Sequence, residues 1–260
     1  MDPGVWPYLS SFVGGAVIGL VLSVFGGGGS VLATPLLVYV VGVRDPHVAV
    51  GTSAAAVAVN ALAGLIAHGR AGHVKWRCAL VFGAAGLAGV LIGAHLSKQM
   101  PGDRLMFWFA FAMAAIGLSM LVARKETGDP AVVLTMSRTV KLVPLGLVTG
   151  LASGFFGIGG GFLIVPCLMA GAGMTIAHAA ASSLVSVALF GAATSASYAA
   201  SGFVDWPVFL ALVAGGVLGA VAGMRASKAL EGHAGFARRI FALMVLATAA
   251  YVAWRSMGHS

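Results

Sequence analysis

Charged side chains are missing from two long stretches of the chain. Residues 3–43 and 142–204 contain no Asp, Glu, Lys or Arg, and apolar residues dominate both. A helix needs about 20 largely apolar residues to cross a bilayer. A stretch as long as 142–204 must therefore pass through the membrane more than once. This pattern predicts an all-α integral membrane protein.

Polar breaks divide the chain into ten hydrophobic segments, five on each side of a polar linker. The first five are predicted over residues 5–25, 31–43, 47–67, 78–97 and 105–123. The second five are predicted over residues 142–156, 161–173, 177–200, 206–224 and 238–254. We therefore expect a first transmembrane repeat over 1–123, a cytoplasmic linker over 124–141 and a second transmembrane repeat over 142–260.

The two sets of segments repeat each other in sequence. Residues of the first half recur 131 positions later, as in Phe25/Phe156, Gly26/Gly157, Gly28/Gly159, Gly29/Gly160, Leu32/Leu163, Pro35/Pro166 and His47/His178. After a gap of one residue the offset is 130, as in Gly72/Gly202, Val74/Val204, Trp76/Trp206, Ser97/Ser227 and Lys98/Lys228. This correspondence indicates that one fold is used twice.

An odd number of segments in each repeat predicts that the repeats have inverted topology. With alternating sides, eleven of the 15 Lys and Arg residues fall on the side opposite the N-terminus. The positive-inside rule makes that side cytoplasmic, so both termini are predicted to be periplasmic. The loop "HGRAGHVKWR" (68–77) is basic, whereas its counterpart "YAASGFVDWP" (198–207) has lost every Lys and Arg. Transporters commonly use such inverted repeats.

The amino-acid composition indicates which partners the chain is expected to bind. The chain is 60% hydrophobic and 8% charged, with a mean hydropathy of +1.01, whereas soluble domains carry roughly 25% charged residues. The net charge of +8 follows the cytoplasmic loops, so the expected partner is the lipid bilayer and not nucleic acid. Cys78 and Cys167 define no metal site or disulfide framework, and we expect no cofactor. Because no carboxylate lies inside a segment, an anionic or neutral substrate is favoured over a cation.

Glycines crowd into two apolar runs, "FGGGGSVLATP" (25–35) and "FGIGGGFLIVP" (156–166). The segment after each run is too short to cross a hydrocarbon core of about 30 Å, so each run is predicted to turn the chain near the midplane. Such a turn must be buried in protein or line a wet cavity. The following helix start would attract an anion. The candidate substrate-binding glycines are Gly26, Gly27, Gly28, Gly29, Gly157, Gly159, Gly160 and Gly161. Alternatively, these glycines only permit close helix packing.

Polar side chains inside the segments supply further candidates, because hydroxyls and amides can donate hydrogen bonds to an anion without adding charge. They are Ser30, Thr52, Ser53, Asn60, Ser182 and Ser183. Thr52-Ser53 and Ser182-Ser183 occupy matching positions in the two halves. The alternative is that such hydroxyls bond to their own backbone or to a neighbouring helix. His47 and His178 begin matching segments and are expected to cap helices.

The quoted glycine runs, "AVGTSAAAV" and the G-x-V-D-W loop resemble the sulfite exporter TauE/SafE family, also called the toluene sulfonate uptake permease family. The resemblance covers nearly the whole chain. It implies secondary transport of sulfite, sulfoacetate or another sulfonate across a bacterial inner membrane. The family motif carries Thr-Ser in both halves, whereas this chain has Ser182-Ser183.

The expected function is therefore an anion transporter that works by alternating access, with a homo-oligomer left open. One alternative is a membrane scaffold or accessory subunit that transports nothing. Another is an intramembrane hydrolase built on Ser153-Gly154. The surrounding "GLASG" lacks the G-x-S-G spacing, so no enzyme is expected.

Overall fold

The computed structural model describes residues 6–121, 128–129, 132–157, 159–230 and 234–257, and within them the chain is a bundle of helices. Six helices are long and apolar enough to cross a membrane, among the residues that the structure describes. Two shorter apolar helices, Gly29–Val41 and Leu163–Ala172, follow the two glycine runs. The prediction of an all-helical, multi-pass membrane protein is confirmed.

The helices of the first half follow the predicted segments closely. They are α1 (Trp6–Phe25), the 3-10 helix η1 (Gly26–Leu32), α2 (Ala33–Leu36), the π-helix η2 (Leu37–Val41), α3 (Pro46–Arg70), α4 (Trp76–Lys98) and α5 (Gly102–Leu121). Local chemistry sets the start of α3. The Asp45 side chain accepts a hydrogen bond from the His47 N–H, and Pro46 takes the first helical position, where its missing N–H costs nothing.

The second half contains α6 (Met136–Phe156), α7 (Gly161–Ala172), α8 (Ile176–Ala199), α9 (Trp206–Leu230) and α10 (Ala234–Met257). The helix α6 begins inside the range expected to be a linker, because Thr135 caps it and its polar first turns hide the start from a hydropathy pattern. The α8 cap is Thr175, which accepts from the His178 N–H. Asp45 and Thr175 thus do the capping that we expected of His47 and His178.

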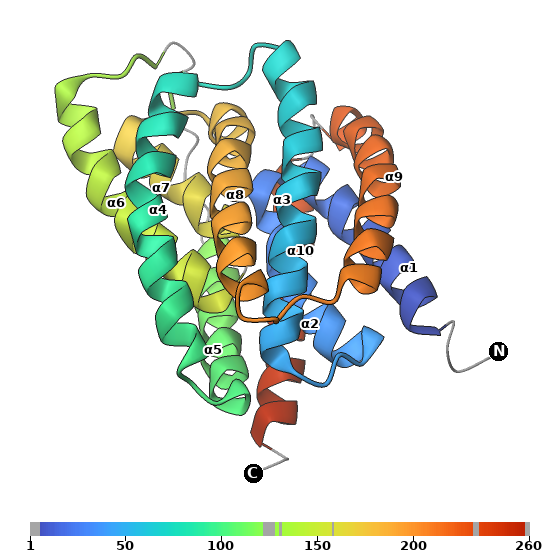
Figure 1. Cartoon of the computed structure of the whole chain (residues 1–260). Helices are drawn as coiled ribbons and strands as arrows, with labels where there is room; N and C mark the ends of the chain where they lie inside the picture. The colour runs from blue at the N-terminus through green and yellow to red at the C-terminus, as the bar shows by residue number, and fades with distance from the viewer. Residues whose placement is uncertain (1–5, 122–127, 130–131, 158, 231–233, 258–260) are drawn as a thin grey trace.

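The chain folds back on itself after α1 and again after α6. Along the first hairpin, Gly14 of α1 faces Leu36 of α2, and Gly29 of η1 faces the α1 backbone at Leu22. Along the second, an added Cβ at Gly171 of α7 would lie 3.0 Å from the Leu142 side chain of α6. The first hairpin opens at the end of the bundle that carries the α8–α9 loop, and the second opens at the end that carries the α3–α4 loop (Figure 1). The hairpins therefore enter from opposite ends, and η1 packs against α7 where their tips meet.

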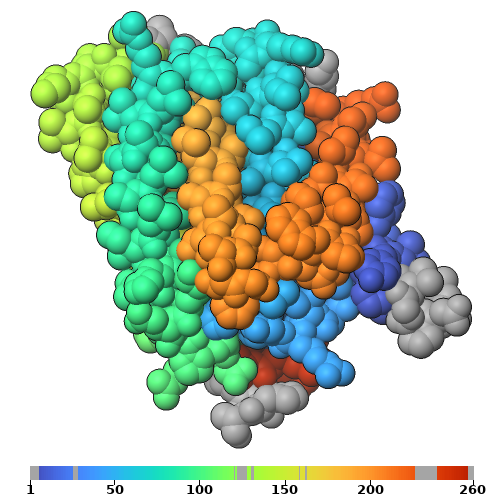
Figure 2. Space-filling model, in the orientation of Figure 1, coloured from blue at the N-terminus to red at the C-terminus, as the bar shows by residue number. Residues whose placement is uncertain are grey.

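Every extensive helix pair joins one half of the chain to the other. The helix α1 packs on α9, α4 on α6, α3 on α8 and α5 on α10. On one face of the molecule α4, α8, α3 and α9 lie side by side, with α8 between α4 and α3 (Figure 2). Glycines bring the α4–α6 and α1–α9 backbones together, since a Cβ at Gly89 would overlap the Leu147 carbonyl oxygen and one at Gly219 the Ala16 carbonyl oxygen. These glycines therefore permit the close packing of the helix backbones.

Aromatic rings anchor each hairpin tip to the last helix of the other half. Phe25, at the end of α1, stacks on Phe241 of α10 with ring centroids 4.6 Å apart. Phe156, at the end of α6, meets Phe109 of α5 edge-on at 5.8 Å. Both contacts lie in one buried apolar cluster that also contains Val31. The tips are therefore held by burial of aromatic surface.

Large apolar side chains cover the outside of the bundle, as expected for a surface that faces lipid. Examples from different helices are Val17, Leu91, Phe111 and Leu218, each more than 40% exposed. The small and polar residues instead gather in the interior, where Ser11, Thr52 and Ser182 are fully buried.

The close approach of α4 and α6 gives a stability prediction. We expect Gly89→Ala to destabilise the protein by about 1–3 kcal/mol, because the new methyl group overlaps the α6 backbone. Gly69→Ala is the control, since its Cβ would only touch the Trp76 ring at 3.5 Å. It should leave the protein as stable or slightly more so. Thermal unfolding of purified protein in lipid nanodiscs measures both, and equal melting temperatures would contradict the packing role of Gly89.

Candidate functional site

The two glycine runs lie at the hairpin tips but have different backbones. Gly26–Gly29 are wound into the 3-10 helix η1. The second run is an open turn in which Gly157, Gly159 and Gly160 all have left-handed φ angles of 62–68°, a conformation that side chains with a Cβ rarely adopt. Both runs turn the chain, as predicted. Among the residues that the structure describes, only the second run needs glycine for its backbone angles.

The second tip is buried between α3 and α8. A Cβ at Gly157 would overlap the Val50 side chain of α3. A Cβ at Gly159 would lie 3.2 Å from Val57 of α3 and 3.3 Å from Val187 of α8. Gly159, Gly160 and Gly161 are buried, as is Gly29 at the first tip. The tip glycines whose burial the structure describes therefore lie inside the protein.

The helix α7 starts at this tip without a side-chain cap. Its N-cap is Gly160, which has no side chain to accept from the first N–H groups. The Gly160 carbonyl accepts from the N–H groups of Leu163 and Ile164. The N–H of Gly161, the first residue of α7, lies at the positive end of the helix dipole. Such a helix start is a favourable place for an anion.

Ser153 of α6 lies beside this helix start. Its side chain is fully buried, and its Oγ has no hydrogen-bond partner. The Oγ is 3.1 Å from the position that a Cβ of Gly160 would take. A buried hydroxyl without a partner costs about 1–3 kcal/mol, so this one is expected to serve a bound group. Sequence reasoning considered Ser153 only as a nucleophile, because its counterpart in the first half is Leu22.

Thr52 and Ser182 form two equivalent hydrogen bonds that cross between the halves. Thr52 Oγ1 of α3 accepts from the backbone N–H of Asp205, which precedes α9. Ser182 Oγ of α8 accepts from the backbone N–H of Lys75, which precedes α4. Both bonds are 2.9 Å long. We call them the Thr52–Asp205 and Ser182–Lys75 latches, since each fixes a loop of one half to a helix of the other.

Hydroxyls close to Thr52 and Ser182 in the sequence form hydrogen bonds within their own half of the chain. Ser53 Oγ lies 2.9 Å from Thr34 Oγ1 in α2 and 3.1 Å from the carbonyl oxygen of Val50, and so ties the first hairpin to α3. Ser183 Oγ donates to the Ala180 carbonyl in its own helix. Ser30 of η1 is buried, and its carbonyl accepts from the Ala33 N–H. These three residues have structural partners in this conformation.

Among the described residues, four other buried polar atoms have no partner: His47 Nδ1 and Asn60 Oδ1 of α3, and the hydroxyls of Ser186 and Thr194 in α8. The Asn60 side chain lies against Gly216 of α9, where a Cβ would overlap its amide. Ser186 Oγ lies 3.5 Å from the place of a Cβ on Gly83 of α4. These atoms lie in the α3 and α8 walls of the interior, where water or a polar solute could satisfy them.

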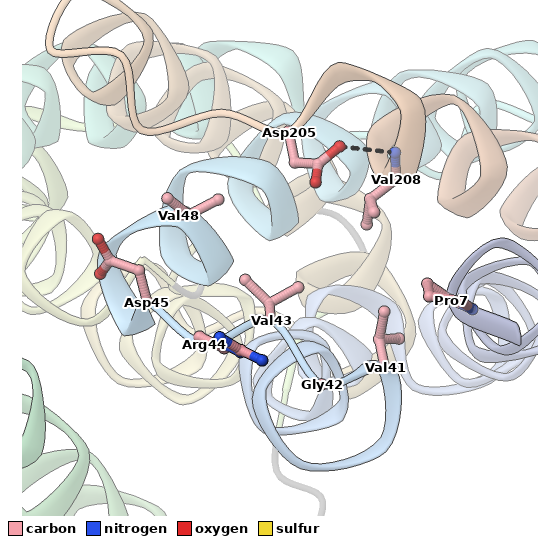
Figure 3. A pocket seen from close by; sticks show the side chains of 9 residues that line it. All are labelled: Pro7, Val41, Gly42, Val43, Arg44, Asp45, Val48, Asp205 and Val208. Atoms are coloured by element: carbon pink, nitrogen blue, oxygen red, sulfur yellow. Dashed lines mark hydrogen bonds between the residues drawn. The ribbon is translucent and has the colours of Figure 1, made fainter. Parts of the chain in front are cut away.

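A cavity of about 300 Å³ opens at the end of the bundle that carries Asp205. Pro7 of α1, the end of η2, the start of α3 and the start of α9 surround it (Figure 3). Arg44 and Asp45 supply charge, and the Asp205 carboxylate accepts from the Val208 N–H at 3.1 Å. The cavity thus adjoins the Thr52–Asp205 latch.

The fold is that of a multi-pass membrane protein, and the proteins to which the chain is similar are named as membrane transporters. A probable membrane transporter protein of Xylella fastidiosa is 44% identical over 243 residues, which cover 93% of both chains. The probable membrane transporter protein YunE of Bacillus subtilis is 28% identical over 241 residues, or 84% of this chain and 87% of the relative. No solved structure matches the chain.

The family model described as "Sulfite exporter TauE/SafE" matches residues 11–252. This chain therefore belongs to the sulfite exporter TauE/SafE family of membrane proteins. The family resemblance expected from the glycine runs and the paired Thr/Ser motifs is confirmed.

The latches give a testable prediction. Thr52→Val removes the acceptor of the Asp205 N–H and leaves that buried group unpaired. It should destabilise the protein by about 1–3 kcal/mol. Thr52→Ser keeps the oxygen and is the matched control, with a much smaller loss. Chemical unfolding in detergent micelles checks this, and equal losses for both variants would show that the hydrogen bond contributes nothing.

Proposed function

We propose that this protein is a secondary transporter that moves a small sulfur-containing anion, such as sulfite or an organosulfonate, across the bacterial inner membrane. The observation that supports it best is the uncapped start of α7 beside the unpartnered Ser153 hydroxyl. Backbone N–H groups, a helix dipole and a hydroxyl donor suit an oxyanion of moderate charge. Ser153 acts here as a hydrogen-bond donor and not as a nucleophile, because no histidine bonds to it.

The two halves act as inverted repeats, residues 1–123 and 142–260 joined by the linker 124–141. Equivalent contacts support this arrangement. The latches relate Thr52 to Ser182 and Asp205 to Lys75 by the same offset of 130 residues. The pairing of α1 with α9 corresponds to that of α6 with α4. Two hairpins that open at opposite ends match transporters in which broken helices from both repeats form a midplane site.

Alternating access follows from breaking one latch at a time. Both latches are formed in this structure, which would be the state with both paths to the centre shut. Separation of the α8–α9 loop from Thr52 would open the end that carries Asp205. Separation of the α3–α4 loop from Ser182 would open the opposite end. The hydroxyls of Thr52 and Ser182 retain their own hydrogens for donation, and the unpartnered Asn60, Ser186 and Thr194 would line the wet path.

The end that carries Lys75 faces the cytoplasm, and both termini face the periplasm. The loop charges support this orientation, since the predicted segments assign eleven of the 15 Lys and Arg residues to loops on the Lys75 side. The 300 Å³ cavity would then be a periplasmic vestibule in which exposed Arg44 attracts anions toward the Thr52–Asp205 latch.

Ser153 provides the decisive variant. Ser153→Ala removes a buried unpartnered hydroxyl, so it should leave the protein at least as stable as before. The same change should lower sulfite flux at least tenfold, because a donor to the anion is lost. Flux is measured with radiolabelled sulfite, and with an arylsulfonate, in liposomes that contain only this protein.

Ser11→Ala is the matched control with the opposite signature. Ser11 is equally buried, and its hydroxyl donates to the Pro7 carbonyl at 2.6 Å. The Ser11→Ala variant should therefore be less stable than the unaltered protein, and its sulfite flux should be unchanged. Undiminished flux by Ser153→Ala would remove this residue from the site. No flux of either probe by the unaltered protein would leave the scaffold alternative standing.

The orientation is tested with single cysteines on opposite loops. Ala71 and Ser201 are exposed counterparts at opposite ends of the bundle. In a background without Cys78 and Cys167, Ser201→Cys should react with an impermeant maleimide on intact spheroplasts. Ala71→Cys should react only after permeabilisation. Labelling of both from the same side would contradict inverted repeats.

A further inference from the structure

Three histidine rings meet where the α3–α4 loop docks on α8. His68 lies in the last turn of α3, His73 in the loop and His178 in the first turn of α8. The His73 ring centroid is 6.2 Å from that of His68 and 6.2 Å from that of His178. The cluster joins both halves of the chain and adjoins the Ser182–Lys75 latch, because Lys75 follows His73 by two residues.

The opposite end of the bundle has the same cluster built from different rings. His47 lies 6.3 Å from Tyr198 and 5.6 Å from Phe203, measured between ring centroids. The loops match in detail: His73 N–H donates to the His68 carbonyl, and Phe203 N–H donates to the Tyr198 carbonyl. Thus His178, His73 and His68 correspond to His47, Phe203 and Tyr198. One end therefore carries three imidazole rings, and the other end carries one.

The surroundings of the three-histidine cluster are mainly cationic. Lys75 lies in the loop and acts on His178. Arg70 ends α3 and Arg77 begins α4. Arg138 of α6 also lies nearby. Its guanidinium is 4.0 Å from the place that a Cβ of Gly173 would take, just before α8 begins. The acidic residue on that side is Asp129, whose backbone N–H bonds the Gly173 carbonyl.

We propose that His68, His73 and His178 form a proton-binding switch that opens the Lys75 end of the transporter. This inference rests on the proposed alternating access and names the proton as its controlling ion. Free imidazole titrates near pH 6.5. Protonation of the cluster places positive charge on both sides of the junction, next to Lys75. Like charges repel, so the loop separates from α8 and the Ser182–Lys75 latch breaks.

The two latch amides report each end separately by hydrogen–deuterium exchange, and no substrate is needed. From pH 7.5 to 5.5, protection of the peptide around Lys75 should fall at least tenfold after correction for the intrinsic exchange rate. The peptide around Asp205 should change less than threefold, because that end carries one imidazole ring in place of three. The full chain in lipid nanodiscs is the sample.

Exchanging the ring types between the ends provides the matched variants. His68→Tyr with His73→Phe installs the rings of the other end and should abolish the pH response at Lys75. Phe203→His should create a response at Asp205. If the double variant does not fold, exposed His73→Phe alone should reduce the response at least threefold.

Equal loss of protection at both ends would overturn the switch, and so would a full pH response in the His68→Tyr, His73→Phe variant or in His73→Phe alone. The exchange result is independent of flux. If liposomes move no anion but the switch responds, the proposed function fails and the switch stands. If flux is present and protection at Lys75 does not depend on pH, only the switch fails.

Discussion

The need to satisfy backbone polar groups inside a hydrocarbon layer governs this structure. Two hairpins end within the bundle, so both tips place non-continuous helix where lipid offers no hydrogen bonds. Protein surrounds them instead: η1 packs on α7, and Phe25 and Phe156 stack on helices of the opposite half. Once the tips are enclosed in this way, the uncapped start of α7 becomes a buried polar site and not a defect.

The contacts at the hairpin tips are more extensive than those that hold the loops at the two ends of the bundle. Each latch is one hydrogen bond between a loop and a helix, and a single bond contributes only about 1 kcal/mol net. The aromatic and glycine contacts that hold the tips are far more extensive. The proposed alternating access would use this difference, because one latch could break while the contacts between the tips remain.

Much of the fold could be predicted because hydropathy and the internal repeat are properties of neighbouring residues. The glycine runs predicted both hairpins, and the matched loops predicted equivalent positions for Lys75 and Asp205. The start of α6 was missed because polar first turns and the Thr135 cap carry no hydropathy signal. The partners of Thr52 and Ser182 lie 153 and 107 residues away, so only the three-dimensional structure brings them together. Ser153 was missed as a donor because it has no counterpart in the first half.

The pairing of helices also bears on how the protein is made. The helices α1, α3, α4 and α5 each find their main partner among α6–α10. A ribosome delivers the N-terminal half first, so that half waits in the membrane with its glycine faces and hydroxyls uncovered until the second half is inserted. A chain that ended after α5 would lack the main packing partner of each of these helices.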